Sequence, residues 1–226
     1  MIADRVADAL DRIAKAVAAA GRPANSVTLL PVSKTRPVAD ISEAAATGLT
    51  SFAENRPQEL AAKAQALPGL GWVLIGPLQR NKAGLAARYA SQFQALDSLP
   101  LACALDRQLQ DLGRPLEVLI EVNTSGEATK HGVAPDEAVA LARGLADCQA
   151  LRPVGLMTVA AQGPQPVVRG CFQALREVQS RLRDEGFDWP QLSMGMSDDF
   201  EWAIDEGSTV VRLGTAIFGP RPTAVQ

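Results

Sequence analysis

Val27-Thr28-Leu29-Leu30-Pro31-Val32-Ser33-Lys34 is the stretch that decides the fold. The mostly apolar run that precedes Lys34 is typical of a strand buried in a parallel sheet. In β/α repeats, the carboxyl ends of such strands carry the reactive groups. Lys34 stands at this end, where apolar surroundings disfavour a charged ammonium. A neutral amine attacks carbonyl carbons and forms a Schiff base, whereas the ordinary alternative is a solvated lysine that follows a strand.

Strand-like and helix-like segments alternate along the rest of the chain. We expect strands at residues 27–33, 51–54, 72–76, 94–96, 117–122, 153–159, 192–196 and 210–214. We expect helices between them at residues 38–47, 56–66, 81–89, 99–109, 135–147, 165–185 and 198–206. This alternation, with no run of consecutive strands, favours an α/β fold of the closed (β/α)8 TIM barrel type. An open doubly wound sheet is the alternative, and closure depends on the short strand at 94–96.

Bulk composition limits the class of protein. The chain has 226 residues, of which 47% are hydrophobic and 21% are charged, and this predicts one globular barrel domain over residues 1–226. The net charge of -3 argues against a nucleic-acid partner. We expect no membrane segment, because charged residues interrupt the apolar runs. The tail at residues 220–226 is expected to be frayed.

The N-terminal segment has helical rather than signal-peptide character. Its apolar residues recur at helical spacing, which predicts an amphipathic packing helix. They are Ile2, Val6, Leu10, Ile13 and Val17.

Few residues suited to metal or triad chemistry are present. Cys103, Cys148 and Cys171 are scattered without a CxxC pair, which predicts a cytoplasmic location. His131 is the only histidine, so we expect no metal site and no catalytic triad.

Polar and small residues follow the expected strands, and the carboxyl ends of barrel strands share one face. The last two strands supply Ser197 and Gly214-Thr215, whose hydroxyl and N–H groups suit a phosphate. The ordinary alternative is a helix cap at Ser197 and a tight turn at Gly214. A lysine amine together with a phosphate cradle predicts an aldehyde that carries a phosphate, such as pyridoxal 5′-phosphate. Arg212 would then lie near the pyridine nitrogen, or else form a salt bridge.

Ordered motifs along nearly the whole chain resemble the pyridoxal-phosphate homeostasis proteins, which are also described as alanine-racemase N-terminal-domain-like proteins. The matching segments are residues 30–35 (LPVSKT), 52–59 (FAENRPQE), 72–82 (WVLIGPLQRNK), 122–127 (VNTSGE), 130–132 (KHG), 155–158 (GLMT), 192–199 (LSMGMSDD) and 211–219 (VRLGTAIFG). The chain departs from the family at Val73, where the family usually has His, and at Ala53, where Gly is common.

The resemblance implies a barrel of the alanine-racemase N-terminal type with pyridoxal phosphate held as an internal aldimine on Lys34. It implies phosphate contacts from Ser197, Gly214 and Thr215, and a position for Arg212 near the ring nitrogen. It also places Asn55, Met157 and Met196 around the ring. The role it implies is cofactor homeostasis, with no catalytic residues and with recipient apo-enzymes as partners.

Two alternatives stay open from the sequence. One is a pyridoxal-phosphate-dependent amino-acid racemase, although a second base is not evident, because Tyr89 is the only tyrosine and lies in an expected helix. The other is a Schiff-base lyase of the aldolase type that acts on a phosphorylated sugar. We expect a monomer. Lys63, Lys82 and Lys130 are possible secondary acceptors of the cofactor, and Lys82 is preferred.

Overall fold

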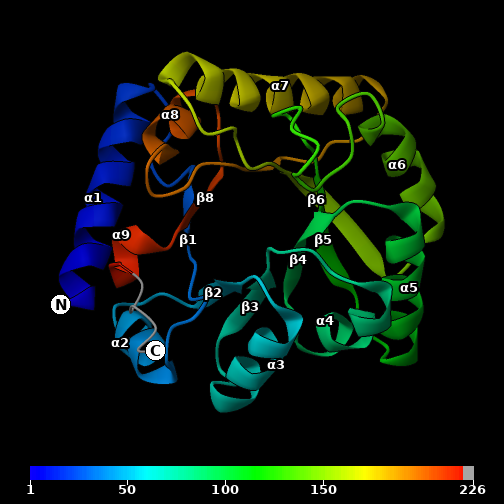
Figure 1. Ribbon diagram of the computed structural model, residues 1–226, viewed down its shortest axis with the longest axis horizontal. Coiled ribbons are helices and arrows are strands. Elements are labelled where there is room, and N and C mark those ends of the chain that lie inside the picture. Colours follow the sequence, from blue (N-terminus) through cyan, green and yellow to red (C-terminus); the bar gives the residue numbers. More distant parts are fainter. Residues whose placement is uncertain (221–226) are drawn as a thin grey trace.

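Eight short parallel strands form the centre of the molecule, and the computed structural model describes residues 1–220 (Figure 1). The strands are β1 (Thr28–Pro31), β2 (Ser51–Glu54), β3 (Gly71–Leu74), β4 (Gln92–Leu96), β5 (Leu116–Glu121), β6 (Leu151–Met157), β7 (Gln191–Ser193) and β8 (Val210–Leu213). Their order is β1-β8-β7-β6-β5-β4-β3-β2. A bridge between Val32 and Ala53 joins β1 to β2 and completes the ring. The sheet is therefore a closed barrel, and the open doubly wound alternative is wrong.

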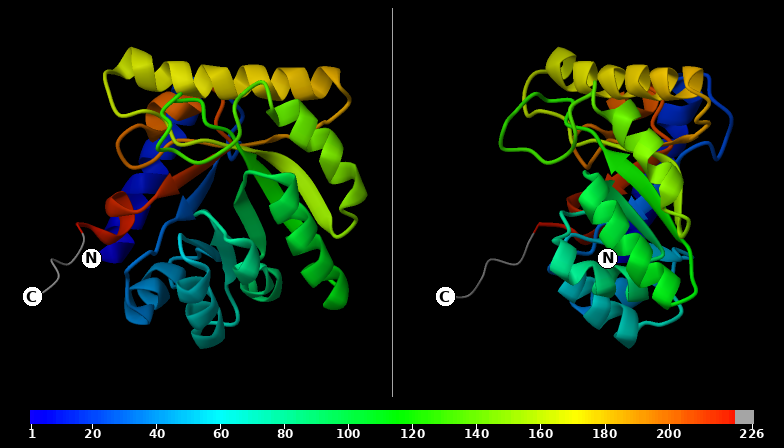
Figure 2. Two further views of the ribbon diagram at one scale, coloured as in Figure 1. Left: turned by 45° about the vertical axis from the view of Figure 1, so that its right-hand side comes forward. Right: turned by 90° about the vertical axis from the view of Figure 1, so that its right-hand side faces the viewer.

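Helices cover the outside of the barrel between successive strands (Figures 1 and 2). They are α1 (Ile2–Ala19), α2 (Val38–Ala45), α3 (Pro57–Ala66), η1 (Arg80–Lys82), α4 (Ala83–Tyr89), α5 (Leu99–Asp111), α6 (Ala138–Gly144), η2 (Leu145–Asp147), α7 (Gln165–Asp184), α8 (Phe200–Asp205) and α9 (Thr215–Phe218). The N-terminal helix α1 packs against α8 and α9, next to the seam where β8 meets β1.

Most expected elements are confirmed, although several of them begin or end at other residues than expected. The strand expected at 94–96 exists and begins earlier, at Gln92. The helix expected from residue 81 begins as the 3-10 turn η1, and the helix expected at 135–147 is divided into α6 and η2. The four-residue helix α9 was not predicted, because so short an element shows no periodicity. Residues 221–226 of the expected tail lie outside the described residues.

The amphipathic character of α1 is confirmed, with one correction. Val6, Ala9, Ile13 and Val17 are buried, whereas Leu10 is 45% exposed. The small residue Ala9 faces the core in its place, one position earlier on the helix. None of the helices within residues 1–220 is both long and apolar enough to cross a bilayer.

The core has an outer and an inner part. The large outer cluster lies between sheet and helices and includes Trp72, Phe93 and Phe172. The small inner cluster fills the barrel with Leu30, Val32, Ala53, Val73 and Val210. This inner packing forms a floor beneath the carboxyl ends of the strands.

Gly155 permits the close approach of β6 to β7, because a Cβ at this position would collide with the backbone oxygen of Gln191. We expect Gly155→Ala to lower the free energy of unfolding by about 1–3 kcal/mol, as overpacking does. Gly170→Ala is the matched control, because Gly170 lies at an exposed position of helix α7 with open space at its Cβ position. That change should stabilise the protein by about 0.5–1 kcal/mol. Urea unfolding of both variants checks the pair, and equal effects would contradict the packing account.

Candidate functional site

A cavity of about 380 Å³ opens at the carboxyl ends of β1, β2, β7 and β8. All the residues predicted to bind the cofactor line it, apart from Met157; they are Lys34, Asn55, Met196, Ser197, Arg212, Gly214 and Thr215. Met157 is the last residue of β6, only 1% exposed, and packs into the outer core. Val32, Ile75 and Val159 give the cavity apolar walls, and Asp198 completes the lining.

Lys34 is half-buried and stands in a tight turn directly after β1. The turn closes through a hydrogen bond from the N–H of Arg36 to the carbonyl oxygen of Ser33, at 3.0 Å. The next residue, Thr35, has a φ of 65°. A β-branched residue in this left-handed region is strained by about 1–3 kcal/mol. The backbone around Lys34 therefore needs support from its surroundings.

A buried ion cluster that the sequence reasoning missed lies under this turn. Lys63 on α3 donates hydrogen bonds to Glu54 Oε1 at 2.6 Å, Glu59 Oε1 at 2.8 Å and the carbonyl oxygen of Ser33 at 2.8 Å. Burial raises the pKa of Glu54 despite its bonds from Lys63 and Ser33. Burial also acts to raise the pKa of Glu59, but hydrogen bonds from Lys63 and Thr35 lower it below its ordinary value. The i,i+4 spacing of Glu59 and Lys63 was the available sequence signal.

Arg212 of β8 is the second buried cation at the site and is only 3% exposed. Its guanidinium donates to the carbonyl oxygen of Ser193 at 2.7 Å, to the Ser193 hydroxyl at 2.8 Å and to the carbonyl oxygen of Thr158 at 2.8 Å. Burial lowers the pKa of Arg212 to about 10, although Glu121 and Asp199 act to raise it. Arg212 therefore remains a cation at neutral pH and is held in one place by β7 and by the residue after β6.

The segment after β7 brings Ser197 beside the start of α9. The N–H of Ala216 donates to Ser197 Oγ at 3.3 Å, which ties the two segments together. Asp199 accepts a hydrogen bond from the N–H of Met196 at 2.6 Å and closes the intervening turn. Burial raises the pKa of Asp199. Ser197, Gly214 and Thr215 thus form one polar edge of the cavity.

Asn55 supplies a polar group on the β2 side. Its side-chain oxygen is buried and has no hydrogen-bond partner among the described residues. A buried acceptor of this kind costs free energy unless a donor reaches it. Since Asn55 lines the cavity, a bound molecule with a hydrogen-bond donor would satisfy this oxygen.

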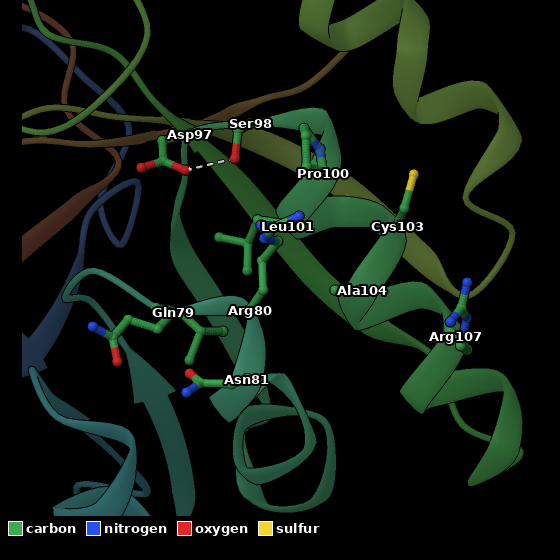
Figure 3. A pocket seen from close by; sticks show the side chains of 11 residues that line it. Gln79, Arg80, Asn81, Asp97, Ser98, Pro100, Leu101, Cys103, Ala104 and Arg107 are labelled. Carbon is green, nitrogen blue, oxygen red and sulfur yellow. Dashed lines mark hydrogen bonds between the residues drawn. The ribbon is translucent and has the colours of Figure 1, made fainter.

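Two other hollows in the described part of the chain contain none of the predicted binding residues. One, of about 1070 Å³, lies between the loop that carries Arg80 and Asn81 and helix α5, with Cys103 and Arg107 on the α5 side (Figure 3). The other, of about 540 Å³, lies at the amino ends of the strands and includes Val73. Val73, at which the chain departs from the family pattern, therefore lies away from the Lys34 cavity. It belongs to the small inner cluster of the barrel, which also includes Ala53.

Two of the lysines considered as secondary acceptors of the cofactor already use their amines in hydrogen bonds and ion pairs. The ammonium of Lys63 lies within its ion cluster, and Lys130 donates to the carbonyl oxygen of Ala160 at 2.7 Å and pairs with Glu127 at 3.0 Å. Lys82 is the last residue of η1. The contacts of Lys63 and Lys130 make both poorer nucleophiles, and the preference for Lys82 stays a prediction.

Glu121, at the end of β5, is a buried carboxyl whose titration makes stability depend on pH. Burial raises its pKa to about 7 from the ordinary 4.5; Arg212 acts to lower it and Asp97 to raise it. Between these values the folded protein keeps a proton that the unfolded chain has released, so stability falls as pH rises through this window. We expect Glu121→Gln to be more stable than the wild type at pH 8, by up to about 3 kcal/mol, and to lose most of this advantage near pH 4.5.

Urea unfolding at several pH values measures the Glu121 effect. Glu117→Gln is the matched control, because Glu117 lies on the same strand at an exposed position. A stability difference between Glu121→Gln and the wild type that does not change with pH would contradict the buried-carboxyl account.

Known proteins resemble this chain over the whole of its barrel. Residues 8–222 match the family model "Alanine racemase, N-terminal domain". A Pseudomonas aeruginosa protein named "Pyridoxal phosphate homeostasis protein" is 42% identical, over 97% of this chain and 96% of its own.

Two solved structures share the fold at appreciable identity. An unknown protein from Bifidobacterium adolescentis has a TM-score of 0.91 at 39% identity, covering 96% of this chain and 94% of its own. PipY of Synechococcus elongatus, solved with PLP bound, has a TM-score of 0.83 at 34% identity, covering 97% of this chain and 100% of its own. On the strength of its sequence and its barrel, this chain belongs to the pyridoxal phosphate homeostasis protein family.

Proposed function

We propose that this chain holds pyridoxal 5′-phosphate as a Schiff base on Lys34 and serves the homeostasis of that cofactor. The observation that carries the proposal is the convergence of an amine, a polar edge and apolar walls in one cavity. The Lys34 amine would attack the aldehyde carbon, and one water molecule would leave as the imine forms. The PLP-bound relative PipY, which has the same fold, supports this assignment.

The residues present fit each part of this cofactor. The hydroxyls of Ser197 and Thr215 and the backbone at Gly214 suit the phosphate. Val32, Ile75 and Val159 suit the faces of the ring, and the unpartnered Asn55 oxygen suits a donor on the ligand. Met196, which is 39% exposed, lies at the open side of the cavity.

Arg212 supports a holding role rather than a catalytic one. A guanidinium beside the pyridine nitrogen donates a hydrogen bond but does not give up its proton. A ring without a proton on its nitrogen is a poorer electron sink, which disfavours carbanion chemistry on pyridoxal phosphate. We therefore propose that the protein has no turnover of its own.

The two candidate second bases for a racemase lie outside the cavity lining. Tyr89, in α4, accepts a hydrogen bond from Gln65 at 2.6 Å, and His131 lies exposed in the loop after β5. Racemisation needs a base on each face of the substrate carbon. No observation on the described residues favours the racemase, and membership of the homeostasis family speaks against the sugar-phosphate lyase.

The proposal also covers the domain organisation, oligomeric state, location and partners of the protein. We propose one barrel domain over residues 1–226, a monomer in the cytoplasm, and recipient apo-enzymes that accept the cofactor. Free thiols at Cys103, Cys148 and Cys171 support the location, because reducing compartments preserve them.

Lys34→Ala tests the attachment point. We expect the variant to fold but to lose the visible absorption band of the Schiff base, because no amine remains at the end of β1. Lys15→Ala is the control, since Lys15 is an exposed lysine on α1 that pairs with Asp11. Absorption spectra after addition of pyridoxal phosphate decide the matter, and an unchanged band in Lys34→Ala would rule out Lys34.

Ser197→Ala tests the phosphate edge. Loss of one hydrogen bond should weaken cofactor binding by about 1–2 kcal/mol, while the Schiff-base band keeps its position. Ser180→Ala, at an exposed position of α7, is the control. Titration by fluorescence measures both affinities, and equal affinity in the two variants would remove Ser197 from the phosphate site.

A further inference from the structure

We propose that Lys63 is a positioning residue for Lys34, acting through a buried cluster that holds the backbone on both sides of it. The inference rests on the proposed Schiff base at Lys34 and adds a residue that never touches the cofactor. Lys63 lies on α3, outside the lining of the cavity, and is only 6% exposed.

The ammonium of Lys63 has its hydrogen-bonding capacity filled. An ammonium has three N–H donors, and those of Lys63 reach Glu54 Oε1, Glu59 Oε1 and the carbonyl oxygen of Ser33. Glu54 is fully buried and Glu59 is a quarter exposed at its side chain. These contacts fix the ammonium between β2, α3 and the end of β1.

The two carboxylates extend the cluster to the residues that flank Lys34. The Ser33 hydroxyl donates to Glu54 Oε1 at 2.6 Å, and the N–H of Thr35 donates to Glu59 Oε1 at 2.7 Å. The residue before Lys34 and the residue after it are therefore both held by groups that Lys63 binds directly. Lys34, between them, lines the cavity.

The Lys63 cluster supports the backbone at Thr35, where the conformation is unfavourable. Thr35 has a φ of 65°, which a β-branched residue seldom adopts without external contacts. The N–H of Thr35 donates to the Glu59 carboxylate in this turn, and Lys63 holds that carboxylate in place. Without Lys63, Glu59 is free to turn toward solvent, and the turn loses its constraint.

A purely stabilising role accounts less well for the arrangement. Burying an ion cluster carries a large desolvation cost, and apolar replacements of similar volume are often as stable. Here every acceptor of the Lys63 ammonium is in, or bonded to, the turn that carries Lys34. The specific consequence of the cluster is the location of that turn, and hence of the attacking amine.

The test compares Lys63→Met with the wild type in two assays on the full-length apo-protein. Methionine has nearly the volume of lysine without its charge. We expect Schiff-base formation with pyridoxal 5′-phosphate, followed by stopped-flow absorption, to slow by about ten- to a hundredfold, as misplaced reacting groups do. Binding of pyridoxine 5′-phosphate, an alcohol that cannot form an imine, should stay at the wild-type level.

The paired assays separate positioning from general damage. A loss of pyridoxine 5′-phosphate binding in step with the rate would show that Lys63 only maintains the fold, and would overturn the proposal. An unchanged rate in Lys63→Met would overturn it equally. If the wild type forms no Schiff base at all, the proposed function fails instead. Lys15→Met, which removes an exposed charge on α1, is the control.

Glu59→Ala provides a second test should Lys63→Met not fold. Glu59 is partly exposed, so its loss leaves the buried Lys63–Glu54 pair in place while it frees the N–H of Thr35. We expect slower Schiff-base formation with unchanged pyridoxine 5′-phosphate binding. Glu43→Ala is the control, because Glu43 accepts a backbone hydrogen bond from Ile2 away from the cavity. Equal rates in the two variants would overturn the proposal.

Discussion

Closure of the barrel between β1 and β2 is the contact on which the site depends. The bridge between Val32 and Ala53, extended by the bond from the N–H of Ser33 to the carbonyl oxygen of Ala53 at 2.9 Å, brings the ends of these strands together. Lys34 and Asn55 therefore line the same cavity, and the loop after β1 contacts Glu54 through the Ser33 hydroxyl. An open sheet would separate the Lys34 amine from Asn55 and from Glu54, because β1 and β2 are the two ends of the strand order.

Two buried cations support the walls of the cavity, Arg212 at β7 and β8 and Lys63 at β1 and β2. Arg212 donates hydrogen bonds to the last residue of β7 and to the residue after β6, and Lys63 binds two carboxylates and the turn after β1. Each has its charge matched by hydrogen bonds, as buried charges require. Lys63 thereby fixes the turn that carries Lys34, and Arg212 joins the ends of β6, β7 and β8, in agreement with the holding role proposed above.

The sequence predicted the barrel and most of the cavity, because both depend on local patterns. Alternating apolar segments indicate the strands, and the residues after each strand indicate the rim, so Lys34, Ser197 and Arg212 were expected together. Met157 was placed at the ring by resemblance, but it points into the outer core. The i,i+4 pair of Glu59 and Lys63 was visible in the sequence, but its contact with Ser33, 30 residues from Lys63, depends on the tertiary fold. The left-handed Thr35 was equally invisible, since no residue type there signals it.

The most direct test of the account is peptide mass mapping of the wild-type protein after loading with pyridoxal phosphate and reduction with borohydride. Reduction converts an imine into a stable amine and so records which lysine carried it. The account predicts a pyridoxyl group on the peptide that contains Lys34. A pyridoxyl group found only on a peptide with Lys82 or Lys130, or on none, would contradict it.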